Sequence, residues 1–208
     1  MTATVANAPR IAVFCGAADP ADPIHLQAAA AAGRLLAVRG IHVVFGGGRL
    51  GLMGQLADAA LAAGGTVTGI LPAALNSPDI AHPGLTSLEI VQDTATRKAR
   101  LVDLADAVLA LPGGLGTLDE LAHVWAGDAY TAGPPPVGLL NTSGFYTPLL
   151  DFLRRTAAGG FFGHHGLRVD DLAVVDDNPT RLVHTLIARI HRPAPRRRTP
   201  ATHRASTS

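Results

Sequence analysis

The residues best suited to chemistry lie at positions 111–120, which read Leu-Pro-Gly-Gly-Leu-Gly-Thr-Leu-Asp-Glu. The apolar run 107–111 has the length of a buried strand, and a helical pattern starts at Thr117. The first N–H groups of a helix have no internal partners and lie at the positive end of its dipole, and glycines let an anion such as phosphate come close to them. The segment therefore predicts a strand, an anion-binding turn and a helix, with Glu120 one turn into that helix.

Thr117 and Glu120 also fit a simpler interpretation. Thr-x-x-Glu is a capping box, in which the threonine accepts from helix N–H groups and the glutamate bonds back to the cap residue. Such a cap needs one oxygen acceptor, whereas glycine occupies three of the four positions 113–116. The glycines favour an anion site, and the capping box remains the alternative.

A cluster of basic residues marks the start of another predicted helix. Arg97, Lys98 and Arg100 lie in its first turn, after Asp93 or Thr94 as the cap. Cations are unfavourable at the positive end of a helix dipole, so their presence there favours a functional role. Because a guanidinium binds phosphate through two parallel hydrogen bonds, the cluster predicts a second contribution to an anion site. A solvent-exposed basic turn is the alternative.

A second glycine-rich loop follows an earlier apolar run. Residues 46–51 read Gly-Gly-Gly-Arg-Leu-Gly after the run 41–45, and G-x-G-x-x-G between a strand and a helix is typical of dinucleotide-binding sites. Those sites need an acid at the end of the next strand, and the next acid here is Asp79. A nicotinamide dehydrogenase is therefore disfavoured. We expect both glycine loops to line one nucleotide-sized pocket, with phosphate at one helix terminus and the sugar or base near the other.

The elements that must position these residues alternate regularly. We predict strands at 10–15, 41–45, 66–71, 88–91, 107–111, 137–140 and 172–175. We predict helices at 21–38, 50–63, 95–105, 117–127, 146–158 and 179–190. Strands that alternate with helices of this length indicate βαβ crossovers and a mainly parallel sheet. The expected fold is α/β, a Rossmann-like doubly wound sheet with helices on both faces, whose ligands bind beyond the C-terminal ends of the strands.

Length and composition fit one domain. The chain has 208 residues, of which 48% are hydrophobic and 16% charged, which suffices for one well-buried core and not for two ordinary domains. We place a nucleotide-binding catalytic domain at residues 10–190, between a flexible N-terminus at 1–9 and a basic tail at 191–208 that its composition predicts to be disordered. Five of the 17 basic residues lie in the tail, which has no acid, so the remainder has 12 basic and 16 acidic residues. A mildly acidic body does not favour nucleic-acid binding.

Other features bear on compartment and cofactors. Cys15 is the one cysteine, which excludes an internal disulfide, and its place after an apolar run fits a small buried side chain. No apolar run reaches the roughly 18–20 residues of a membrane span and the N-terminus lacks a signal-peptide pattern, so we expect a cytoplasmic protein without membrane contact. His164 and His165 are adjacent, which disfavours zinc, and no metal is expected. Trp125 and Tyr130 fit a core or an interface better than base stacking.

Two long motifs occur in the chain with a recognisable order and spacing. Residues 112–120 match P-G-G-x-G-T-x-x-E at every fixed position, and residues 46–54 match G-G-G-x-x-G-L-M-G. With these motifs, residues 10–190 resemble the LONELY GUY (LOG) family of cytokinin riboside 5′-monophosphate phosphoribohydrolases, many of whose members were once labelled lysine decarboxylases. The resemblance implies hydrolysis of the N-glycosidic bond of a nucleoside 5′-monophosphate, of adenosine or of a cytokinin, to free base and ribose 5-phosphate. It also implies a homodimer that uses no metal or cofactor.

The resemblance further assigns roles to residues. It implies catalytic roles for Arg97 and Glu120 and a substrate contact for Lys98. An acid after the third strand contacts substrate in the family, and ungapped matching places Asp79 there. The other predicted substrate contacts belong to the two glycine loops, namely Gly113, Gly114, Leu115, Gly116, Thr117, Gly46, Gly47 and Gly48.

Two other functions stay open at this point. One is a nucleotide-binding module without turnover, which the presence of both Arg97 and Glu120 disfavours. The other is a pyridoxal-dependent decarboxylase, in which the Schiff base would have to form on Lys98, the only lysine of the chain.

Overall fold

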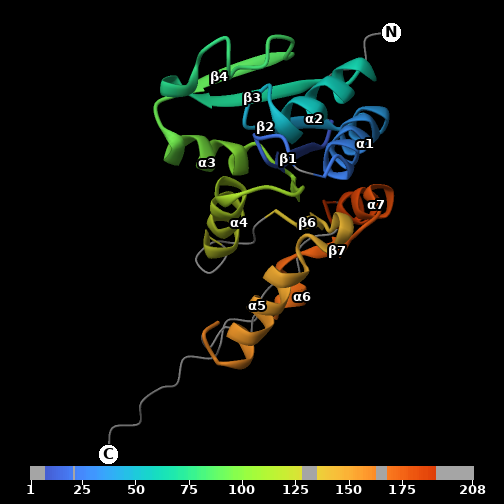
Figure 1. The fold of residues 1–208 in the computed structure, drawn as a ribbon, viewed down its shortest axis with the longest axis vertical. Coiled ribbons are helices and arrows are strands. Elements are labelled where there is room, and N and C mark those ends of the chain that lie inside the picture. The colour runs from blue at the N-terminus through green and yellow to red at the C-terminus, as the bar shows by residue number, and fades with distance from the viewer. Residues whose placement is uncertain (1–7, 21, 128–134, 163–167, 191–208) are drawn as a thin grey trace, which may run out of the picture.

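A computed structural model describes residues 8–20, 22–127, 135–162 and 168–190 of the chain. Within them, seven strands form one parallel sheet in the order β4-β3-β2-β1-β5-β6-β7 (Figure 1). The strands are β1 (Arg10–Phe14), β2 (His42–Phe45), β3 (Val67–Pro72), β4 (Ser87–Val91), β5 (Ala107–Ala110), β6 (Val137–Leu140) and β7 (Val174–Asp176). The expected α/β fold with a parallel sheet is confirmed.

Helices connect successive strands. They are α1 (Ile24–Val38), α2 (Gly51–Ala62), α3 (Thr94–Asp103), α4 (Leu115–Gly127), α5 (Thr147–Ala158), α6 (Val169–Leu172) and α7 (Pro179–Ile190), with 3₁₀ segments η2 (Ala73–Leu75) and η3 (Thr142–Gly144). Asp93 caps α3, because its side chain accepts a hydrogen bond from the Thr96 N–H at 2.8 Å. Of the two caps that the sequence allowed, the structure therefore uses the aspartate.

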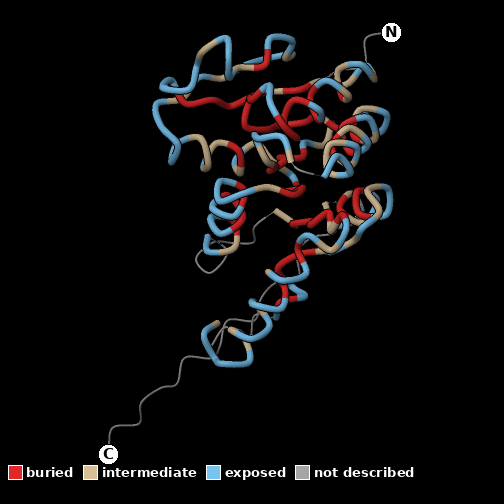
Figure 2. Tube along the Cα trace, in the orientation of Figure 1, coloured by how far each residue is buried: buried red, intermediate tan, exposed pale blue. Residues whose placement is uncertain are grey.

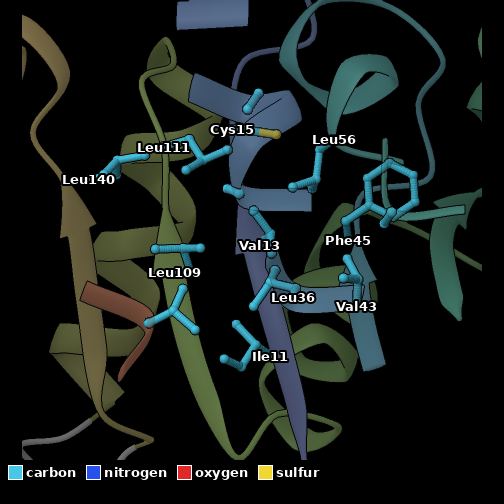
Figure 3. Close-up of a cluster of buried hydrophobic side chains, with 14 of the residues drawn as sticks. Ile11, Val13, Cys15, Leu36, Val43, Phe45, Leu56, Leu109, Leu111 and Leu140 are labelled. Carbon is cyan, nitrogen blue, oxygen red and sulfur yellow. The ribbon is translucent and has the colours of Figure 1, made fainter. Parts of the chain in front are cut away.

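The sheet is covered on both faces because side chains alternate along each strand. In β1, Ile11 and Val13 belong to a core cluster with α1, α2 and α7, whereas Ala12 and Phe14 belong to a second cluster with α3, α4 and α5. Figure 3 shows the first cluster at β1 and its neighbouring strands. Figure 2 shows burial concentrated on the central strands, while the edge strand β4 is mostly exposed. Burial on both faces explains why the strands read as short, continuous apolar runs.

The order of the strands changes direction at β1. This strand lies in the middle of the sheet and pairs with β2 on one side and β5 on the other. The helices that follow β1 and β5 cover opposite faces, since α1 packs in the first core cluster and α4 in the second. Ligands of open parallel sheets bind in the crevice that such a switch point creates beyond the carboxyl ends of the strands. Both glycine loops, after β2 and after β5, lie at this edge.

Some predicted boundaries are wrong. α4 starts at Leu115 and not at Thr117, and the Leu118 N–H already bonds the Gly114 carbonyl at 3.1 Å. The short α6 has no counterpart in the sequence prediction, and because it occupies the residues up to Leu172, β7 starts later than expected. Most of the predicted flexible N-terminus and the whole basic tail lie outside the described residues. None of the described helices has the length and apolar character needed to cross a membrane.

Candidate active site

A pocket of about 570 Å³ opens at the C-terminal edge of the sheet, at the switch point between β1 and β5. Its wall comes from the loop after β1, the first turn of α2, the loop after β5 and the first two turns of α4. One residue of α3, Arg97, reaches the same pocket. The structure therefore brings Arg97 and the glycine loop after β5 to one place, whereas Lys98, Arg100 and the glycine loop at residues 46–51 lie outside the pocket lining.

Arg97 and Glu120 form an ion pair inside this pocket. Arg97 Nη2 lies 3.1 Å from Glu120 Oε1, and the two side chains are 14% and 7% exposed. The pair forms because α3 and α4 pack on the same face of the sheet, with Arg97 in the first turn of α3 and Glu120 in the second turn of α4. Arg97 Nε is buried and has no hydrogen-bond partner among the described residues. That N–H is therefore unsatisfied within the described part of the chain.

Burial changes the acidity of Glu120. The loss of water around the carboxyl raises its pKa to about 7, although the neighbouring Arg97 opposes the rise. Asp119 adds to the rise and Lys98 reduces it. At neutral pH, a group with this pKa is present as carboxylate and as neutral acid in comparable amounts, which suits proton transfer to and from a substrate.

Two glycines are required by the geometry of the pocket. A Cβ on Gly46 would collide with Arg97 Nη2, so only glycine leaves room for the guanidinium at the end of β2. A Cβ on Gly113 would collide with Thr117 Oγ1 and come within 2.8 Å of Gly16 N. The loop after β2 thus admits Arg97, and the loop after β5 lets α4 start close to the loop after β1.

The start of α4 is open to the pocket. Gly114, Gly116 and Thr117 line the pocket, and Gly114 provides the first carbonyl of the helical hydrogen-bond ladder. The N–H groups of the first turn therefore have no intrahelical partner, which is the geometry of an anion site. Thr117 is the third residue of the helix and cannot be its cap, and the carboxylate of Glu120 bonds Arg97. The capping-box interpretation is wrong.

Other predicted site residues lie outside the pocket lining. Lys98 follows Arg97, but its Nζ donates to both carboxylate oxygens of Asp119, at 2.8 Å each. Asp79 is exposed between η2 and β4, beside residues that line a second pocket of about 610 Å³. The remaining predicted contacts outside the lining are Leu115, Gly46, Gly47 and Gly48.

Sequence patterns do not indicate a large part of the pocket wall. The loop at residues 15–20 forms one side, with His25 at the start of α1 and Phe145 just before α5. A backbone bond from the Met53 N–H to the Gly16 carbonyl, at 3.3 Å, ties this loop to α2. The expected binding of ligands beyond the C-terminal ends of the strands could have indicated this loop, whereas no local pattern marks His25. 

Cys15 and Trp125, which the sequence associated with the core, lie in the two core clusters or pack against them. Cys15 is 2% exposed and belongs to the first core cluster, which confirms a buried cysteine, and burial raises the pKa of its thiol. Trp125 packs against the second core cluster and donates to the Leu172 carbonyl at 3.1 Å. Tyr130, His164 and His165 lie outside the described residues. Within the described part of the chain, no group of three or more His, Cys, Asp or Glu side chains could hold a metal ion.

Known proteins of similar sequence decide the family. A family model described as "Possible lysine decarboxylase" matches residues 53–186. A cytokinin riboside 5′-monophosphate phosphoribohydrolase of Rhodococcoides fascians is 42% identical over 152 residues, which make up 73% of this chain and 77% of the relative. The chain belongs to this phosphoribohydrolase family. An Arabidopsis thaliana phosphoribohydrolase of the same designation is 37% identical over 169 residues, or 81% of this chain and 78% of that one.

Solved structures share the fold of this family member. The molybdenum cofactor binding protein of Rippkaea orientalis superposes with a TM-score of 0.68 at 23% identity, over 89% of this chain and 99% of the other. The Moco carrier protein of Chlamydomonas reinhardtii does so with a TM-score of 0.66 at 23% identity, over 88% and 99% of the two chains. At this identity the similarity concerns the fold alone, and it agrees with the doubly wound sheet.

Proposed function

We propose that this protein hydrolyses the N-glycosidic bond of a nucleoside 5′-monophosphate and releases free base and ribose 5-phosphate. The observation that carries the proposal is the buried Arg97–Glu120 pair, which shares one pocket with the open start of α4. The pocket volume of about 570 Å³ lies in the range of small-molecule sites. Relatives at 37% and 42% identity are named for this reaction on cytokinin riboside 5′-monophosphates.

Glu120 is the catalyst in this proposal. Cleavage of the C1′–N bond builds positive charge on the ribose ring, and a carboxylate near C1′ stabilises that charge. The same carboxylate takes a proton from the attacking water as the water oxygen bonds to C1′, and the electron pair of the broken bond leaves with the base. The leaving nitrogen gains one proton and Glu120 later gives up the one it took, so the products are free base and ribose 5-phosphate and Glu120 is again a carboxylate. The pKa of about 7 makes Glu120 a stronger base than an ordinary glutamate.

Arg97 holds the substrate and the catalytic carboxylate in one site. One of its terminal nitrogens bonds Glu120, and a guanidinium carries five N–H donors, so others remain for the nucleotide. A phosphate at the start of α4 and the carboxylate of Glu120 repel each other, and the guanidinium between them reduces that repulsion.

Lys98 and Asp79 stay predicted substrate contacts, and neither belongs to the pocket lining. Lys98 holds Asp119 on α4 and so connects the helices that carry Arg97 and Glu120. A pyridoxal-dependent decarboxylase is not favoured, because the only lysine is committed to this ion pair and lies outside the pocket lining.

A substrate panel tests the proposed reaction. AMP, an N6-substituted AMP, ADP, ATP and adenosine are incubated with the protein, and free base is quantified by HPLC. We expect base from the monophosphates, and a loss of about 100-fold or more in kcat/KM for Arg97→Ala. The exposed histidine of α7 provides a matched surface variant, His184→Ala, which should keep full activity. Release of no base from any monophosphate would favour a binding module without turnover.

We also propose that the protein is a cytoplasmic homodimer without nucleic-acid or membrane partners. Leu115 and Leu118 on α4 are 84% and 37% exposed, and such apolar side chains favour an interface. A free cysteine at position 15 fits a reducing compartment. Light scattering should give the mass of two chains at micromolar concentration, and the mass of one chain would contradict the dimer.

A further inference from the structure

His25 lines the pocket with an imidazole whose hydrogen bonding is incomplete. It is the second residue of α1, and its Nδ1 is buried with no hydrogen-bond partner among the described residues. Nδ1 is the one atom of this ring found both buried and unpartnered within the described residues. Because an unpartnered polar atom removed from water costs free energy, a histidine at this place is unfavourable for folding alone. A binding role for the other ring nitrogen, Nε2, would be a reason to keep a histidine here despite that cost.

A chain of contacts connects His25 to the strand end that precedes the glycine loop after β5. The ring of His25 meets the ring of Phe145 edge-on, with centroids 5.7 Å apart, and Phe145 meets Tyr146 in the same manner at 5.1 Å. The buried hydroxyl of Tyr146 donates to the Leu111 carbonyl at 2.6 Å. Leu111 directly precedes the Pro-Gly-Gly turn, so these contacts connect His25 to the base of the proposed phosphate site.

The catalytic pair lies on the other side of that phosphate site. The strands at the pocket follow the order β2-β1-β5-β6, and the guanidinium of Arg97 lies against Gly46 at the end of β2. Phe145 follows β6, at the opposite side of β5. A nucleotide whose phosphate binds at the start of α4 must extend toward Glu120 to bring C1′ to the carboxylate. Its phosphate end therefore faces His25.

We propose that His25 binds the 5′-phosphate of the nucleotide through Nε2, so that the phosphate lies between the start of α4 and the imidazole. This assignment rests on the proposed hydrolysis of a nucleoside 5′-monophosphate. Arg97, the other basic side chain of the lining, bonds Glu120 and lies against Gly46 at the end of β2, and the exposed Asp19 adds a negative charge to the loop after β1. A phosphate at the His25 end of the pocket therefore needs a hydrogen-bond donor that neither Arg97 nor Asp19 supplies, and the Nε2–H of His25 provides one.

The two reaction products test the two ends of the pocket separately, because ribose 5-phosphate carries the phosphate and adenine does not. His25→Phe keeps an aromatic ring against Phe145 but removes both nitrogens, and the dissociation constants of ribose 5-phosphate and adenine are measured by calorimetry. We expect ribose 5-phosphate to bind about 10-fold or more weakly, as for the loss of one hydrogen bond to a charged group, with adenine unchanged. His25→Gln retains an N–H donor and should restore most of the affinity. His184→Phe, on exposed α7 surface, should change neither constant.

Each alternative result overturns the assignment. Weaker adenine binding with unchanged ribose 5-phosphate would place His25 at the base, and equal weakening of both would indicate a structural role. Unchanged binding of both, or no binding of ribose 5-phosphate to the unaltered protein at millimolar concentration, would also refute it. Calorimetry does not require turnover, so a protein that binds as expected but releases no base would support His25 as a phosphate ligand and refute the proposed hydrolysis.

Discussion

Replacement of Glu120 by glutamine should separate catalysis from stability. Glutamine keeps the shape of the side chain but can neither stabilise the ribosyl cation by charge nor take a proton from water, which should lower kcat by about 10²–10⁴-fold. Stability should respond differently. The pKa of Glu120 is about 7 in the folded protein and 4.5 for an ordinary glutamate, and this difference corresponds to about 3 kcal/mol in the free energy of unfolding. Because the unfolded chain loses this proton near pH 4.5 and the folded protein near pH 7, folding becomes less favourable by up to that amount as pH rises between them.

The assay combines AMP turnover with thermal unfolding at pH 5 and pH 8. At pH 5 the two proteins should unfold at nearly the same temperature, because the carboxyl is neutral in the folded state. At pH 8 Glu120→Gln should be at least as stable as the unaltered protein, by up to several degrees, since it lacks the buried charge. A near-normal kcat would refute the catalytic role. A variant several degrees less stable at pH 8 would refute the reasoning about burial.

Three further predictions concern pH, the glycine loop and the tail. kcat/KM for AMP should rise with pH to a plateau with a midpoint near 7, because the carboxylate of Glu120 is the active form, and a profile flat from pH 5 to 9 would contradict this. Gly46→Ala should displace Arg97 and lower kcat/KM by at least about 10-fold in steady-state kinetics. Gly84→Ala is the control, because a Cβ there meets only ordinary contacts, and it should change kcat/KM little. Truncation after Arg192 should leave activity and Tm nearly unchanged, since the removed tail has no apolar stripe, and a fall of several degrees would show that it docks.

The fold was predictable because its physical signals are local. A strand buried on both faces, such as 107–111, must be apolar along its whole length. Helices of ten or more residues between such strands allow each strand to return parallel to the one before it, which indicates a parallel sheet. The start of α4 was misplaced because Gly114 and Gly116 carry no side-chain pattern, so helical periodicity becomes visible only at Thr117. A helix that begins with glycines shows no hydrophobic periodicity in its first turn, so its start cannot be located from the sequence pattern.

The site was predictable only in part. Arg97 was a candidate because a cation is unfavourable in the first turn of a helix, and Glu120 was one because it follows a glycine turn. Their contact joins residues 23 positions apart and depends on how α3 and α4 pack, which the sequence does not indicate. His25 obeys ordinary helix rules, and Phe145 follows a turn in which Ser143 adopts a positive φ of 54°. Tertiary structure alone brings these two residues to the pocket, because their contact joins the start of α1 to the end of β6.

We propose that the Arg97–Glu120 pocket cleaves the bond between ribose and base and leaves the phosphate ester intact. A product balance on AMP tests it most directly, with adenine, ribose 5-phosphate, adenosine and inorganic phosphate quantified in the same reaction by HPLC and phosphate assay. We expect equimolar adenine and ribose 5-phosphate, no adenosine or inorganic phosphate, and a fall of about 10²–10⁴-fold in both products with Glu120→Gln. Adenosine with inorganic phosphate, or adenine release that is indifferent to Glu120, would contradict it.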